Sequence, residues 1–174
     1  DEVLASFPAI PDVNRPHGPN RLFVQDHGQE FDKGLLSLEP PVEDRTREYV
    51  VLVPSVDADG NEVPGIRGPH LMVPIATYTG WNLRRIGEAE ESMCAVYGSY
   101  LPFPDDEAER MNKKDPRESR ESRYQSGQAY LDELGEATNF LVGQRLLLRE
   151  DAVRCLVQAG DLTEDNIDEN SESR

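Results

Sequence analysis

The hydrophobic pattern of this chain changes period once, near Gln128, and that change limits what the chain can fold into. Before this point apolar residues come in short extended runs, such as Tyr49–Val53 and Leu71–Tyr78. After it they recur about every 3.6 residues, the period of a helix with one apolar face. We therefore predict an α+β chain: a β-hairpin or small sheet, two C-terminal helices packed on it, and much irregular structure. Too few strand–helix–strand alternations occur to build a parallel sheet from this chain alone.

Two apolar runs and a turn predict where the strands lie. The run Tyr49–Pro54 is β-branched and nearly continuous, which is typical of a buried strand, although Pro54 limits its hydrogen-bond ladder. Asp57–Asn61 favours a tight turn, because Asp, Gly and Asn tolerate left-handed φ angles. We expect a β-hairpin or meander between about residues 48 and 78, and a short strand at Leu22–Val24.

The second half of the chain is predicted to be helical. A short helix over Asp105–Met111 is stopped by Pro116. A longer helix begins at Gln128 and runs for roughly four turns. Its inward stripe consists of Leu131, Leu134, Thr138, Leu141, Val142 and Arg145. A second helix begins near Glu150 and ends at Gly160, a residue that commonly caps helix C-termini. Its inward residues are Val153, Leu156 and Val157.

Charge and length indicate the domain organisation and exclude several partners. The 174 residues include 34 acidic and 18 basic ones, a net charge of −16. Such a surface repels phosphate, which argues against a nucleic-acid partner, and we interpret the charge as favouring solubility. No apolar run is long enough to span a membrane. We expect residues 1–160 to form one folded unit that begins with a proline-rich arm at 1–22, and 161–174 to be an acidic disordered tail. The apolar residues of the arm need another surface to cover them, and we expect no such surface within this chain.

Motifs for known chemistries are missing from the sequence. No Gly-x-Ser-x-Gly nucleophile elbow, phosphate-binding loop or dinucleotide-binding glycine pattern occurs. Ser99 and Ser126 each match half of the elbow pattern, which chance explains. The spacing of the histidines gives no reason to expect a shared metal ion; they are His17, His27 and His70. We interpret Cys94 and Cys155 as buried thiols. The sequence therefore assigns no catalytic residue and no cofactor.

Two segments remain as candidate binding sites. Around the only tryptophan, an apolar face and polar side chains are typical of a ligand pocket. The pocket candidates are Tyr78, Trp81, Asn82, Arg84 and His70. The alternative is that Trp81 fills the core and its polar neighbours cap the next turn. Three oxygen-bearing side chains in the turn are weak calcium candidates: Asp57, Asp59 and Asn61. The glycine comes too early for an EF-hand loop, so a plain hairpin turn is the alternative.

Several blocks of the sequence carry a resemblance to a known family. They are Val56–Glu62, Gly65–Arg67, Val73–Arg84, Gly98–Phe103, Ala108–Arg110, Asp115–Arg117, Glu121–Tyr124 and, more weakly, Leu146–Asp151. Over about residues 5–157 the chain resembles the C-terminal region of the alpha/beta hydrolase domain-containing family, and the Gly80–Arg84 block is fairly specific to it. The resemblance implies a serine hydrolase of the α/β-hydrolase fold whose nucleophile elbow and catalytic histidine lie upstream of the matching region.

This resemblance implies that the chain is inactive by itself. No triad residue can be carried over onto it, so residues 1–160 are expected to finish a larger hydrolase domain and cover one side of its site. Its partners would be the upstream catalytic part and a small ester-like substrate. Because the sequence begins Asp1-Glu2-Val3 without Met, we expect either processing or a piece of a longer chain. Relatives look exported, which leans toward a periplasmic or secreted location. The alternative function is a stand-alone binding module that uses the Trp81 region or a calcium-binding turn.

Overall fold

The computed structural model describes residues 7–13, 22–84, 87–89 and 94–171. Four strands lie in this part of the chain: β1 (Phe23–Asp26), β2 (Val42–Glu48), β3 (Ala76–Thr79) and β4 (Ser99–Pro102). The helices are the 3-10 turn η1 (Phe31–Lys33) and α2 (Pro69–Met72), α3 (Glu107–Lys113), α4 (Arg120–Arg123), α5 (Gly127–Gly143) and α6 (Arg149–Ser171). Within the described residues the strands form two antiparallel pairs, β1–β2 and β3–β4. The α+β class is therefore confirmed.

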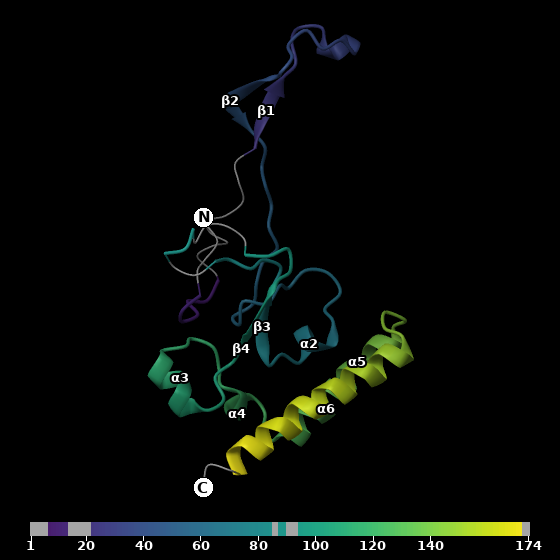
Figure 1. Ribbon diagram of the computed structural model, residues 1–174. Coiled ribbons are helices and arrows are strands. Elements are labelled where there is room, and N and C mark those ends of the chain that lie inside the picture. Colours follow the sequence, from purple (N-terminus) through teal and green to yellow (C-terminus); the bar gives the residue numbers. More distant parts are fainter. Residues whose placement is uncertain (1–6, 14–21, 85–86, 90–93, 172–174) are drawn as a thin grey trace.

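The β1–β2 pair projects away from the rest of the molecule (Figure 1). Its register places Asp26 opposite Val42 and Phe23 opposite Glu48, with an irregularity after Phe23. The predicted short strand at Leu22–Val24 thus exists, shifted by one residue at its start. None of the residues in β1 and β2 is buried, so this hairpin contributes no core of its own.

The segment that follows the hairpin contradicts the predicted buried strand at Tyr49–Pro54. After Tyr49 donates its backbone N–H to the Leu22 carbonyl, the chain runs extended with no ladder partner. Val50 and Leu52 are both 86% exposed. The physical reason is that a β-branched run becomes a buried strand only when neighbouring strands pair with it and other side chains cover it. The described residues supply neither here.

The turn at Asp57–Asn61 is confirmed, but the antiparallel pairing expected between about residues 48 and 78 is limited to residues 55–63. A single bridge between Val56 and Glu62 closes the turn. Gly60 supplies the left-handed φ of 83° that the turn requires. β3 then pairs with β4, with Tyr78 opposite Tyr100, rather than with the preceding extended segment.

The short helix α3 starts and ends two residues later than expected. The Asp106 side chain accepts a hydrogen bond from the Glu109 N–H and caps the helix start. The helix ends where Lys114 adopts a left-handed φ of 56°, two residues before Pro116. The expected proline stop thus lies just beyond the end of the helix.

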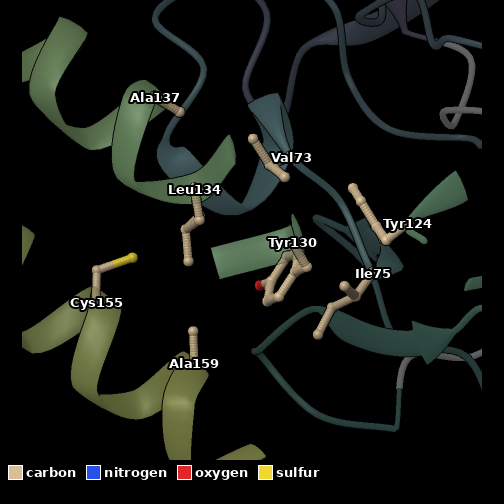
Figure 2. Packing of buried hydrophobic residues seen from close by; sticks show 8 residues of the cluster. All are labelled: Val73, Ile75, Tyr124, Tyr130, Leu134, Ala137, Cys155 and Ala159. Atoms are coloured by element: carbon tan, nitrogen blue, oxygen red, sulfur yellow. The ribbon is translucent and has the colours of Figure 1, made fainter. Parts of the chain in front are cut away.

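The main core lies where α5 and α6 pack beside α2 and the start of β3 (Figure 2). α5 begins at Gly127, one residue before the predicted Gln128, because Ser126 caps it by accepting from the Ala129 N–H. The predicted inward positions Leu134, Thr138 and Leu141 are buried, as are two positions that the prediction missed, Tyr130 and Ala137. Arg145 instead lies beyond the helix, exposed and with a positive φ.

The inward face of α6 agrees with the prediction at Leu156, which packs against the core, and differs from it at two valines. Val153 and Val157 are 61% and 58% exposed, while Ala152, Cys155 and Ala159 are buried. Small side chains on this face let α6 approach α5 closely. This explains why alanines, and not the larger valines, lie at the contact between the two helices. The inward face is therefore rotated about one position from the predicted one.

α6 also continues past Gly160, so the predicted end there is wrong. The helix runs to Ser171 through residues that were expected to be disordered. One glycine inside a helix costs only about 1 kcal/mol and does not end it without a further stop signal. The division into a domain at 1–160 and a tail at 161–174 stays a prediction. No helix in the described part of the chain is both long enough and apolar enough to span a bilayer.

The expectation that the N-terminal arm lacks a partner within the chain is wrong for its described part. Phe7 and Ile10 are 7% and 8% exposed. The Phe7 ring lies 5.3 Å from the Trp81 ring, centre to centre. A Cβ at Gly60 would come within 2.9 Å of the Phe7 ring. The arm therefore covers the Asp57–Asn61 turn.

Candidate functional site

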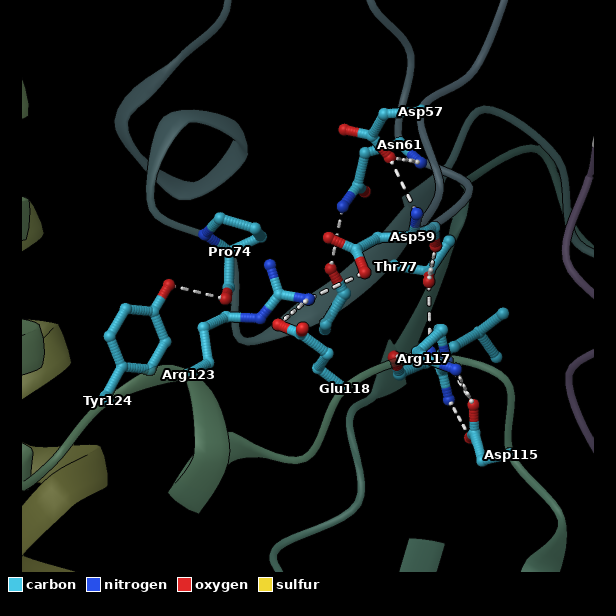
Figure 3. Close-up of polar contacts among 12 residues, drawn as sticks. Asp57, Asp59, Asn61, Pro74, Thr77, Asp115, Arg117, Glu118, Arg123 and Tyr124 are labelled. Atoms are coloured by element: carbon cyan, nitrogen blue, oxygen red, sulfur yellow. Dashed lines mark hydrogen bonds and ion pairs between the residues drawn. The ribbon is translucent and has the colours of Figure 1, made fainter.

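The turn at Asp57–Asn61 is held by its own carboxylate, as Figure 3 shows, and by Arg67. Asp57 Oδ1 accepts hydrogen bonds from the backbone N–H groups of Asp59 and Asn61, each at 3.0 Å. Asp57 Oδ2 accepts from Arg67 at 2.9 Å. Both carboxylate oxygens of Asp57 are thus engaged in fixing the turn.

Asn61 and Thr77 fasten this turn to β3. Asn61 is fully buried; its Nδ2 donates to the Ala76 carbonyl at 3.1 Å and its Oδ1 accepts from the Tyr78 N–H at 2.7 Å. In this way the amide pairs with the strand as a backbone group would. The Thr77 hydroxyl, also fully buried, donates to the Asp59 carbonyl. The turn and the strand therefore form one hydrogen-bonded unit.

Arg117 occupies the centre of a second, buried network. Its guanidinium pairs with both oxygens of Asp115, at 3.0 and 2.7 Å. It also donates to the Thr77 hydroxyl at 3.0 Å and to the carbonyls of Leu101 and Pro102 at 2.9 and 3.0 Å. Burial by itself raises the pKa of Asp115, but the hydrogen bonds and charge of Arg117 outweigh it and hold that pKa below its usual value.

Arg123, the last residue of α4, adds an ion pair to the turn. It pairs with Asp59 at 2.7 Å and lies 3.8 Å from Glu118. Its guanidinium carbon stands 4.7 Å from the centre of the Phe103 ring, and that ring is 2% exposed. With the paired carboxylates of Asp57 and Asp59 and the engaged amide of Asn61, the geometry favours a structural turn over a calcium site. No group of three or more metal-binding side chains gathers among the described residues.

A different set of side chains gathers on the α5–α6 side of β3. Cys155 of α6 lies with its Sγ 3.6 Å from Nε2 of His70 in α2. The His70 ring is 6.3 Å from that of Tyr78, and Tyr78 contacts Tyr100 across the sheet. Burial raises the pKa of Cys155 and lowers that of His70, so both groups are held in their neutral forms near pH 7. Burial likewise raises the pKa of Tyr78.

The structure divides the predicted ligand pocket in two. His70 and Tyr78 lie together, whereas Trp81 contacts Phe7, in keeping with its interpretation as a packing residue. The Asn82 carbonyl accepts from the Cys94 N–H at 2.7 Å, and the Arg84 side chain is exposed. As a pocket, the five-residue set stays a prediction. Sequence reasoning missed that Cys155 meets His70, because the contact joins positions 85 residues apart.

No serine-hydrolase arrangement is present among the described residues. The Ser99 hydroxyl donates to the Trp81 carbonyl at 3.0 Å, and Ser126 caps α5. His27 stacks on Phe31 in the projecting hairpin, at 4.7 Å between ring centres. Within this part of the chain, no serine hydroxyl hydrogen-bonds a histidine, and His17 lies outside the described residues. Cys94 is exposed, so its interpretation as a buried thiol is wrong.

An open cavity of about 400 Å³ lies between the N-terminal arm and α3. Four of its charged lining residues pair with each other: Lys113 with Glu109 at 2.6 Å, and Arg117 with Asp115. A fifth, Asp105, pairs with Arg120 outside the lining.

A family model described as an alpha/beta hydrolase domain matches residues 12–157. Neither the curated proteins nor the solved structures contain a match to this chain.

Proposed function

The chain belongs to the alpha/beta hydrolase domain family, and on this basis we propose that it forms the C-terminal, non-nucleophilic part of a serine hydrolase. In this role it completes the hydrolase domain and covers one side of an active site whose serine lies in an upstream segment. The complete enzyme cleaves a small ester-like substrate. Alone, the chain is inactive.

Two observations on the residues support a non-nucleophilic role. The 174 residues contain no Gly-x-Ser-x-Gly turn, which members of the α/β-hydrolase fold use to expose the nucleophile. The half-matching serines are committed to structural hydrogen bonds: Ser99 to the Trp81 carbonyl and Ser126 to the first turn of α5. Among the described residues, neither has an imidazole to accept its proton, as nucleophilic activation requires.

The single observation that carries the proposal is the exposed segment Tyr49–Val53, which we call the docking strand. Its residues alternate between 86% exposure at Val50 and Leu52 and 37–39% at Val51 and Val53. Apolar side chains on both faces are typical of an interior strand of a parallel sheet covered on both sides. Burying one Val or Leu side chain contributes about 1.5–3 kcal/mol. The docking strand therefore fits a sheet that the upstream part of the hydrolase supplies.

The native gene product tests this proposal. We would capture it from host extract and medium with an antibody raised against the chain, and treat it with a fluorophosphonate that reacts with activated serines. The expected result is one labelled polypeptide well above 19.6 kDa, the mass of the chain. A native product of 19.6 kDa, labelled or not, would contradict the proposal.

Substitutions in the docking strand test its role separately. In the purified chain Val50→Lys and Leu52→Lys are expected to change the free energy of unfolding by less than about 0.5 kcal/mol, because both sites are exposed. In the complete enzyme the same changes bury a charge and are expected to abolish soluble, active protein. Val96→Lys is the matched control, since Val96 is 93% exposed and lies outside the strand. Equal activity in all three variants would refute docking.

A further inference from the structure

The contact between Cys155 and His70 has no part in the proposed function. It joins α6 to α2 across 85 residues of sequence, with Sγ and Nε2 3.6 Å apart. Cys155 is 9% exposed, and His70 is partly exposed beside it. A buried thiol and a half-buried imidazole thus face each other.

The spacing of the two atoms matches a pair of ligands on one tetrahedral metal ion. Zinc binds thiolate sulfur at about 2.3 Å and imidazole nitrogen at about 2.0 Å. At a tetrahedral angle, these bonds place sulfur and nitrogen about 3.5 Å apart. The measured 3.6 Å therefore lets both side chains bind the same ion with little movement.

A buried hydroxyl without a partner gives a second, independent indication of a ligand. Tyr130 is 4% exposed, and its hydroxyl has no hydrogen-bond partner among the residues that the structure describes. Figure 2 shows this hydroxyl on the side of the ring that faces α6, the helix that carries Cys155. Leaving a buried hydroxyl unpaired costs about 1–3 kcal/mol. A water molecule bound to a metal ion at Cys155 and His70 would supply the missing hydrogen bond.

We propose that Cys155 and His70 bind a divalent metal ion of zinc type, with a metal-bound water hydrogen-bonded to the Tyr130 hydroxyl. On binding, the Cys155 thiol releases its proton to solvent and the sulfur coordinates as a thiolate, while His70 coordinates through Nε2. Thiolate and imidazole select zinc-like ions over calcium or magnesium, which prefer oxygen ligands. Solvent completes the coordination sphere, so the site is open, in contrast to a closed structural site.

Cobalt(II) titration of the full 174-residue chain tests this site, because cobalt replaces zinc and a thiolate ligand gives an intense charge-transfer absorption. We expect a saturable one-to-one band that zinc displaces. Cys94→Ala, at the exposed cysteine, is the matched control and keeps the band. Cys155→Ala abolishes it, and Tyr130→Phe weakens zinc binding about tenfold.

His70→Ala is a second test of the site that does not depend on the folding of Cys155→Ala. Because His70 is only half-buried, its replacement should leave the fold intact. The variant is expected to retain the native far-ultraviolet circular dichroism and to lose zinc affinity by more than Tyr130→Phe does. Absence of the band in the unmodified chain under excess cobalt would overturn the proposal. So would a band that survives Cys155→Ala, or zinc affinity that His70→Ala leaves unchanged.

Discussion

Replacing Arg117 with methionine is expected to remove much of the stability of this chain. Its side chain is 3% exposed and pairs with Asp115, which is 4% exposed. Arg117→Met leaves the Asp115 carboxylate buried without its partner. It also removes the hydrogen bonds that Arg117 donates to the backbone carbonyls of Leu101 and Pro102. Breaking a buried ion pair from one side costs about 3–5 kcal/mol, against a typical total of about 5–15 kcal/mol for a domain.

Urea unfolding followed by the fluorescence of Trp81, the only tryptophan, measures this loss. Arg154→Met is the matched control, because Arg154 pairs with Asp151 at 2.7 Å but is 71% exposed. That exposed pair is worth less than about 1 kcal/mol. The double variant Arg117→Met/Asp115→Leu should be less destabilised than Arg117→Met, since no unpaired charge remains. If Arg117→Met costs no more than Arg154→Met, the buried network does not stabilise the fold.

The same pair predicts a pH dependence. The pKa of Asp115 lies below its usual value of 3.8 in the folded chain, so its ionised form favours folding. This contribution is present above about pH 4 and is lost as the pH falls through the folded-state pKa. The destabilisation caused by Arg117→Met should therefore shrink in strongly acidic solution, when protonation removes the unpaired charge. An unchanged difference between the two proteins from neutral to acidic pH would contradict this reasoning.

The remaining predictions concern the turn and β4. Asn61→Ala should cost about 2 kcal/mol in urea unfolding, because it leaves a buried backbone N–H and a carbonyl unpaired. Gly98→Ala should lower the melting temperature by several degrees, since its Cβ would lie 1.7 Å from the Thr79 carbonyl oxygen. Gly135→Ala, in a helix and with open space around the new Cβ, should raise the melting temperature slightly. Calcium should leave the melting temperature unchanged, because the Asp57–Asn61 turn is already paired; an upward shift would revive the calcium hypothesis.

Sequence reasoning succeeded where local chemistry decides the structure. α5 starts at Gly127, one residue before the predicted Gln128, because the change to a helical hydrophobic period is a local signal. Asp57–Asn61 forms the expected turn because its φ preferences and carboxylate hydrogen bonds are local. The period-3.6 stripe likewise identified Leu134 and Leu141 as buried, since helix periodicity maps directly onto one face.

It failed where the outcome depends on distant partners. Nothing in the run Tyr49–Pro54 shows whether neighbouring strands exist to cover it, and in the described structure it is exposed. The networks of Arg117 and Arg123 were missed because their partners are spread over as many as 64 positions. The contact between Cys155 and His70 depends on how α6 is rotated about its axis. In this rotation the small side chains of α6 face the core and the larger valines face outward, which the hydrophobic pattern did not indicate.

The central claim is that this chain carries no hydrolytic nucleophile, and the intact mass of the purified 174-residue chain after fluorophosphonate treatment tests it most directly. The account predicts an unchanged mass of 19.6 kDa and no ester hydrolysis above background. A stoichiometric adduct on a serine, abolished by His70→Ala or by His27→Ala, would contradict it, because the chain would then contain its own activated nucleophile.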